Sequence, residues 1–115
     1  MPDSPAKRIF TLDIDQSGTP IVKCHGRLVS GVSNLLYVEV SRLIPGHKRI
    51  VLDLTDLTHM DSMGIGTLVR LYVSARSGGC DLELLNLGKQ IQQLLIRTNL
   101  LSVFTIIGEE NIKMG

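Results

Sequence analysis

Two hydrophobic periods alternate along this chain, and that alternation is the feature that most constrains its fold. Short apolar runs with the spacing of strands are followed by longer segments whose apolar residues recur every three or four positions, as on one face of a helix. Strands separated by helices become parallel neighbours, because a parallel connection must cross over the sheet. The pattern predicts an α/β fold in the order β-β-α-β-α-β-α-β, with a mixed, mostly parallel sheet of about five strands covered by three or four helices. The predicted strands are 9–14, 21–28, 50–54, 82–87 and 103–107. The first predicted helix has its apolar stripe over 32–43, and the other two are 62–76 and 89–98.

Turn formers and caps separate these segments. The turn-rich segment 16–20 joins the first two strands as a β-hairpin, and Pro45-Gly46 ends the first helix, for which Ser30 and Ser33 offer hydroxyl caps. The run 50–54 lacks alternation, which is typical of a central strand buried on both faces. A short loop is expected to follow it and to contain His59. The apolar stripe of the second helix is predicted to contain Ile65, Leu68, Val69 and Tyr72, and that of the third Ile91, Leu94, Leu95 and Thr98.

Length and composition predict one domain, with residues 1–8 as a flexible tail and 9–115 as the folded part. A net charge of +1 gives no strong field to attract nucleic acid or anionic lipid, and 3% aromatic residues leave few rings for base stacking. We find no signal-peptide pattern and no run near the roughly 20 apolar residues that span a bilayer. We therefore expect a cytoplasmic protein, without direct nucleic-acid binding or membrane insertion, whose partner is a protein or a small molecule.

The cysteines and histidines show no ligand spacing for a metal. Cys24 and Cys80 lie in apolar, strand-like surroundings and are expected to be buried thiols in a reducing compartment. Neither His25 nor His47 has a partner at metal-ligand spacing. We expect no metal and no cofactor.

The segment Asp61-Ser62-Met63-Gly64-Ile65-Gly66 is the candidate functional site. Asp61 is placed to cap the helix start, where the macrodipole favours negative charge. Two glycines, each costing about 1 kcal/mol in a helix, suggest close approach by the sheet, a partner or a phosphate. A phosphoryl group on Ser62 would be tolerated at the positive helix end, yet it would change any surface built there. The alternative is that these are ordinary capping residues and glycines that ease packing.

The segment 53–68 resembles the signature of the STAS family, the bacterial anti-sigma factor antagonists. That signature is an aliphatic strand ending in Asp-Leu-Ser or similar, a short loop, and Asp-Ser-Ser-Gly-Leu-Gly opening a helix. Gly26-Arg27-Leu28 is similar to the family's Gly-x-Leu turn after the second strand, and the predicted order of elements agrees with the family over nearly the whole chain. The resemblance implies a single STAS-like domain.

The resemblance also implies a switch. In the family, an anti-sigma factor that is itself a serine kinase phosphorylates the serine at the position of Ser62. The unphosphorylated antagonist binds that kinase and frees the sigma factor, and a serine phosphatase resets the phosphorylated form. The residues then expected to contact the partner are Arg27, Val29, Ser30, His59, Met60, Asp61, Ser62, Met63, Gly64 and Ile65.

This chain departs from the family pattern at two places. Met63 replaces the second serine of the motif, and Gly26-Arg27-Leu28-Val29 stands where many antagonists carry Gly-Glu-Leu-Asp, although other members share the Gly-Arg-Leu start. A STAS module that binds a small ligand or nucleotide, or a transporter or signalling-complex subunit without Ser62 phosphorylation, is therefore the alternative function.

We do not expect this protein to be an enzyme. His59, Asp61 and Ser62 are residue types found in the catalytic triads of hydrolases. Residues so close in sequence rarely adopt the geometry of a triad, however, and no Gly-x-Ser-x-Gly elbow surrounds the serine. Gly64-Ile65-Gly66 is only half of a dinucleotide fingerprint. An aliphatic edge strand near Ile9 could pair two copies, so a homodimer is possible.

Overall fold

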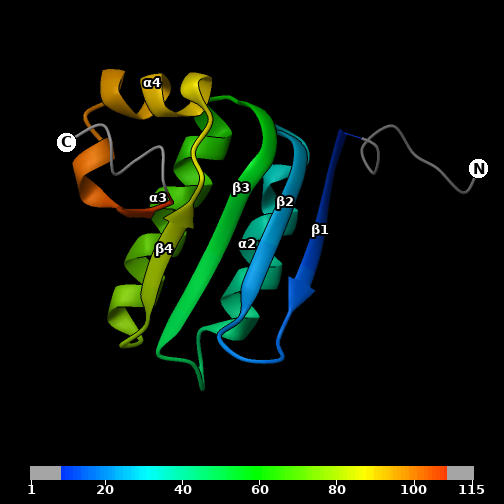
Figure 1. Ribbon diagram of the computed structural model, residues 1–115, viewed down its shortest axis with the longest axis vertical. Coiled ribbons are helices and arrows are strands. Elements are labelled where there is room, and N and C mark those ends of the chain that lie inside the picture. The colour runs from blue at the N-terminus through cyan, green and yellow to red at the C-terminus, as the bar shows by residue number, and fades with distance from the viewer. Residues whose placement is uncertain (1–8, 109–115) are drawn as a thin grey trace, which may run out of the picture.

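The computed structural model describes residues 9–108 and has a five-stranded sheet in the order β1-β2-β3-β4-β5 (Figure 1). Strands β1 and β2 pair antiparallel, and every later pair is parallel, so the predicted mixed sheet and element order are confirmed. The elements are β1 (Phe10–Asp15), β2 (Ile21–Leu28), α2 (Ser33–Leu43), β3 (Arg49–Met60), α3 (Ser62–Ser77), β4 (Asp81–Leu85), α4 (Lys89–Arg97), the short 3-10 helix η1 (Leu101–Val103) and β5 (Thr105–Ile107).

Helices α2 and α3 lie side by side behind the sheet, and α4 lies across the end at which β3 finishes (Figure 1). The core between helices and sheet is almost wholly aliphatic, as the scarcity of aromatic residues requires. Ile50, Val51 and Leu52 are all buried, which confirms a central strand covered on both faces. Both cysteines are buried and free, and burial raises the pKa of the Cys24 thiol to about 12, with a smaller effect from Asp53.

Strand β3 is longer than predicted. The expected loop after Leu54 is wrong, because β3 continues to Met60 and stays paired with β2, with Arg27 beside His59. Thr58 Oγ1 donates to the carbonyl oxygen of Gly26 at 3.0 Å, which ties the two strands together here. Two register shifts in the β2–β3 ladder accompany this polar stretch, and its composition alone looks like a loop.

The buried face of α3 is rotated from the predicted stripe. Leu68 is buried as expected, but Ile65, Val69 and Tyr72 are only half-buried. The rotation follows from the first turn, where the helix approaches the sheet through Gly64. The residues that face the core are Gly64, Thr67, Leu68, Leu71 and Ala75.

Other local predictions also needed correction. Neither serine caps α2: Val32 is its N-cap residue, and the Val29 carbonyl accepts the N–H groups of Val32 and Ser33. In α4, Ile91 and Leu95 are buried as predicted, whereas Leu94 is half-buried. Thr98 is exposed as the C-cap, and its hydroxyl donates to the Leu94 carbonyl oxygen at 2.9 Å. The last strand begins at 105 because η1 occupies 101–103, and the preceding strand ends at 85.

The predicted tail 1–8 and the end of the chain after 108 lie outside the described residues. Within 9–108, no helix is both long enough and apolar enough to cross a membrane.

Helix α3 begins in direct contact with β2. A Cβ atom on Gly64 would collide with the Leu28 carbonyl oxygen and lie 2.7 Å from Met60 Cγ, so only glycine fits. Gly66, two residues on, has nothing within 4 Å of the same position. The sheet therefore explains the first glycine and leaves the second without an internal reason.

These two glycines form a matched pair for stability measurements. We expect Gly64→Ala to lower the free energy of unfolding by about 3 kcal/mol, because a rigid backbone oxygen must move. Gly66→Ala should raise it by about 0.5–1 kcal/mol, because alanine is the better helix former and meets no obstacle. Urea unfolding of both variants checks this; equal effects would contradict the proposed contact with β2.

Candidate functional site

Asp61 joins three segments at the point where β3 ends and α3 begins. Its Oδ1 accepts the backbone N–H of Gly64 at 3.0 Å, which is the predicted N-cap bond. Its Oδ2 accepts the backbone N–H of Ser30 at 2.9 Å, just after β2. The Asp61 N–H donates in turn to the Leu28 carbonyl oxygen at 3.4 Å. One carboxylate thus fixes the loop after β2 against the first turn of α3.

The electrostatics of Asp61 follow from these bonds. The N–H of Ser30 is the largest cause that lowers the pKa of the carboxyl group below its ordinary value of 3.8, and the N–H of Gly64 adds to it, against a smaller opposing effect of desolvation. Asp61 is therefore a carboxylate at neutral pH, with both oxygens held by backbone amides.

Ser62 and Met63 project from this fixed junction. Ser62 is the first residue of α3 and is exposed, and within residues 9–108 its hydroxyl makes no hydrogen bond. Met63 is 55% exposed, which is unusual for a large apolar residue. The arrangement presents a free hydroxyl and an apolar contact side by side at the positive end of a helix.

The β2–β3 register brings most of the predicted partner-binding residues into one surface. Arg27 lies beside His59, and Leu28 beside Met60, so the end of β2 adjoins the start of α3. Gly64 is buried against β2 and contributes shape rather than contact surface. On this surface Arg27, Ser30, His59, Ser62 and Met63 are exposed, and Val29, Met60, Asp61 and Ile65 are half-buried.

A hollow of about 440 Å³ lies next to this surface, between the end of β3 and α4. One wall is formed by Thr58, His59 and Met60, and α4 supplies the other. Sequence reasoning missed the contribution of α4, because about thirty residues separate it from the motif and no local signal links them. The α4 side chains that line the hollow are Gln90, Ile91, Gln93, Leu94 and Arg97.

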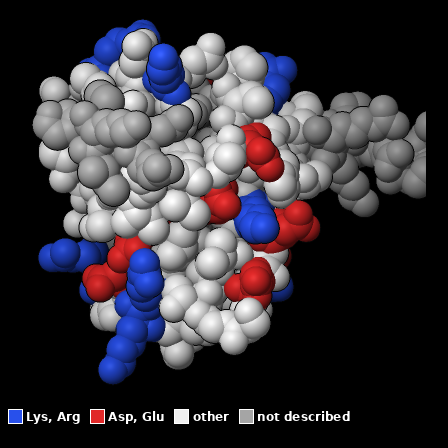
Figure 2. Space-filling view, in the orientation of Figure 1, with Lys and Arg blue, Asp and Glu red and all other residues white. Residues whose placement is uncertain are grey.

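A second polar cluster lies on the face of the sheet that points away from α2 and α3. His25 on β2 is 3.0 Å from Asp13 through Nε2 and 3.0 Å from Asp56 through Nδ1. Figure 2 shows acidic side chains gathered around basic ones over β1 to β3. The three residues come from three strands, so sequence spacing gave no sign of them. Within residues 9–108, no group of three or more His, Cys, Asp or Glu side chains has the geometry to hold a metal ion.

The geometry around His59 differs from a hydrolase triad. His59 Nδ1 lies 2.9 Å from the hydroxyl oxygen of its neighbour Thr58. Both carboxylate oxygens of Asp61 are bound to backbone amides of Ser30 and Gly64, so this acid does not orient the imidazole.

Removal of the Asp61 carboxylate tests its structural role. Asp61→Ala should lower the free energy of unfolding by about 2 kcal/mol at pH 7, the upper end for an N-cap, because the tie to Ser30 is lost as well. Asp61→Asn should lower the free energy of unfolding by about half as much, since the amide has one acceptor oxygen for the two backbone donors.

The same variants should show a defined pH dependence. The folded-state pKa of Asp61 lies below its unfolded value, so the stabilisation is present at neutral pH and is lost as pH falls below about 4, through the folded pKa. The difference between wild type and Asp61→Asn should therefore shrink in urea unfolding below that pH. A constant difference down to low pH would contradict the assignment.

Comparisons with known proteins agree with this fold. An anti-sigma factor antagonist from Mycobacterium paratuberculosis superposes with a TM-score of 0.77 at 16% identity, covering 97% of this chain and 95% of that one. The anti-sigma factor antagonist SpoIIAA in its unphosphorylated form gives 0.71 at 19% identity, covering 90% and 91%. Part of the murine anion transporter Slc26a9 gives 0.62 at 21% identity, covering 70% of this chain and 14% of the transporter. The model of the STAS domain family matches residues 12–111, and the chain therefore belongs to the STAS domain family.

Proposed function

We propose that this protein is a phosphorylation-controlled interaction switch of the anti-sigma factor antagonist type. In its unphosphorylated form it binds an anti-sigma factor that is a serine kinase, and so releases a sigma factor for transcription. The observation that carries the proposal is the exposed hydroxyl of Ser62 on the first residue of α3, beside an aspartate whose two oxygens are both engaged. Structures of the related SpoIIAA exist in unphosphorylated and phosphorylated forms.

The chemistry of the junction explains how one phosphate could act as a switch. The positive end of α3 tolerates about two added negative charges, so the fold survives phosphorylation. Asp61 stays in place because Ser30 and Gly64 hold it. The added charge therefore lies beside an existing carboxylate, on the surface that also exposes Met63. A partner that buries this surface meets like-charge repulsion and a desolvation penalty.

We infer a binding role rather than an enzymatic one. The acid and the histidine near Ser62 contact backbone amides and Thr58, and neither activates the serine hydroxyl. Ser62 is then a substrate of the partner kinase and of a resetting serine phosphatase.

Phosphorylation at Ser62 is the first test of the proposal. Incubation with a cognate serine kinase and ATP should add one phosphate, which intact-mass measurement detects. Ser62→Ala should abolish it, because the acceptor hydroxyl is removed. Ser77→Ala, at the exposed far end of the same helix, is the matched control and should be labelled normally. Equal labelling of Ser62→Ala would reject the acceptor.

Partner affinity is the second test. Ser62→Asp should fold with unchanged or slightly higher stability, because an acid in the first turn favours the helix dipole, yet bind the kinase at least tenfold less tightly. Met63→Asp should weaken binding similarly. Val73→Asp is its control, since Val73 is 56% exposed on the same helix and Met63 is 55% exposed. Equal affinities in a titration of all three variants would reject the docking surface.

The hollow beside α4 supports a second candidate, a STAS module that binds a small ligand or nucleotide. Arg97, Gln90 and Gln93 give it a polar wall suited to an anionic group. A thermal-shift screen of nucleotides and inorganic anions tests this. A stabilising compound whose effect disappears in Arg97→Ala but persists in Ser62→Asp would favour this function over the switch.

A further inference from the structure

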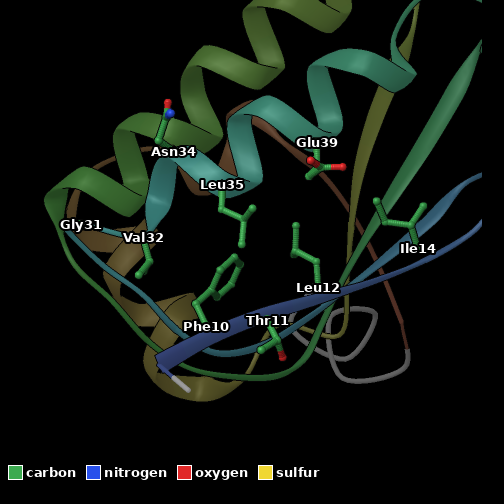
Figure 3. Close-up of a pocket in the computed structure, with 9 residues that line it drawn as sticks. All are labelled: Phe10, Thr11, Leu12, Ile14, Gly31, Val32, Asn34, Leu35 and Glu39. Carbon is green, nitrogen blue, oxygen red and sulfur yellow. The ribbon is translucent and has the colours of Figure 1, made fainter. Parts of the chain in front are cut away.

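A second hollow lies at the β1 edge of the sheet, between β1 and α2. It measures about 610 Å³, within the size range of binding pockets. In Figure 3, Phe10 and Leu12 of β1 and Leu35 of α2 point into one space, whereas Thr11 points away. Leu35 is 43% exposed, and Leu12 and Ile14 are half-buried, so this groove leaves apolar surface in water.

The groove runs along an open strand edge. Strand β1 pairs with β2 on one side, and within residues 9–108 nothing pairs with its other side. Its outward N–H and C=O groups are thus available to an added strand. An open edge with a helix-walled apolar groove beside it is the geometry by which proteins capture extended peptides: the backbone adds to the sheet, and every second side chain enters the groove.

The charges around the groove select the kind of segment that would fit. Glu39 stands on the α2 wall one turn beyond Leu35, and the residues that line the groove include no Lys, Arg or His. On the other face of β1, Asp13 and Asp15 are exposed along the same edge. The basic side chains nearby lie outside the groove and close to acidic ones. His25 contacts Asp13, and Lys23 lies opposite Asp13 on β2. Arg42 lies 3.7 Å from Glu39.

A second copy of this chain fits the edge poorly. Antiparallel pairing of two β1 strands would bring Asp13 and Asp15 of one copy close to those of the other, and like charges opposed across a ladder are destabilising. A strand with basic residues at alternate positions would place positive charge there instead.

We propose that the β1–α2 groove captures an extended segment of a partner protein in which apolar residues alternate with lysine or arginine. The segment adds to the sheet alongside β1. Its apolar side chains pack against Leu12 and Leu35, and its basic side chains lie over Asp13 and Asp15. This site is separate from Ser62 and does not depend on the proposed switch.

The test uses a short fluorescent peptide in which valine and lysine alternate, titrated into the whole protein. Saturable binding is expected, weakened by salt because the charges are exposed. Hydrogen exchange of the β1 amides that point away from β2 should slow when the peptide binds. Peptides in which valine alternates with glutamate, or glycine with lysine, should bind roughly tenfold or more weakly.

Two matched variants locate the site. Leu35→Lys should weaken peptide binding roughly tenfold, because it places a positive charge in the groove. Val38→Lys is the control: Val38 is 38% exposed on the same helix but does not line the groove, so its variant should bind normally. Ser62→Asp should also bind normally, which separates this site from the switch.

Several outcomes would overturn the proposal. These are absence of saturable binding, equal binding of the glutamate peptide, equal binding by Leu35→Lys, or unchanged protection of β1. Concentration-dependent dimerisation that is lost in Leu35→Lys would show that a second copy covers the groove instead.

Discussion

The candidate site depends on the two hydrogen bonds that the Asp61 carboxylate accepts. Its two oxygens bind the N–H groups of Ser30 and Gly64, and these lie in segments about thirty residues apart. Gly64 makes the arrangement possible, because any larger residue would collide with the Leu28 carbonyl oxygen. The loop after β2 and the start of α3 therefore form one rigid surface. Ser62 and Met63 project from it with little structural role of their own.

This separation of structural residues from exposed ones is compatible with the proposed switch, in which the fold tolerates a modification that changes binding. Residues that hold the junction are engaged or buried, and the side chains that a partner would meet are exposed. A change at the exposed positions alters charge and apolar contact without breaking the hydrogen bonds of Asp61. The exposed Ser62 and Met63 lie between the engaged Asp61 and the buried Gly64.

The two hollows of the structure are chemically different. The end of β3 meets α4 in a hollow with amide and guanidinium side chains, beside the exposed serine. The β1 edge combines an apolar groove with carboxylates on both sides. A domain of this size thus offers two surfaces of opposite character.

The sequence by itself determined much of the local structure: the alternation of strands and helices, the cap at Asp61 and the turn at Pro45-Gly46. These depend on hydrogen bonds and periodicities within a few residues. Only the tertiary structure decided that β3 runs on to Met60, that Arg27 lies beside His59, and that His25 lies between Asp13 and Asp56. Register and helix placement depend on contacts between distant segments, and composition near each residue does not encode them. The groove beside β1 and the hollow beside α4 were also decided by the tertiary structure, because each is formed by two elements that meet only in the fold.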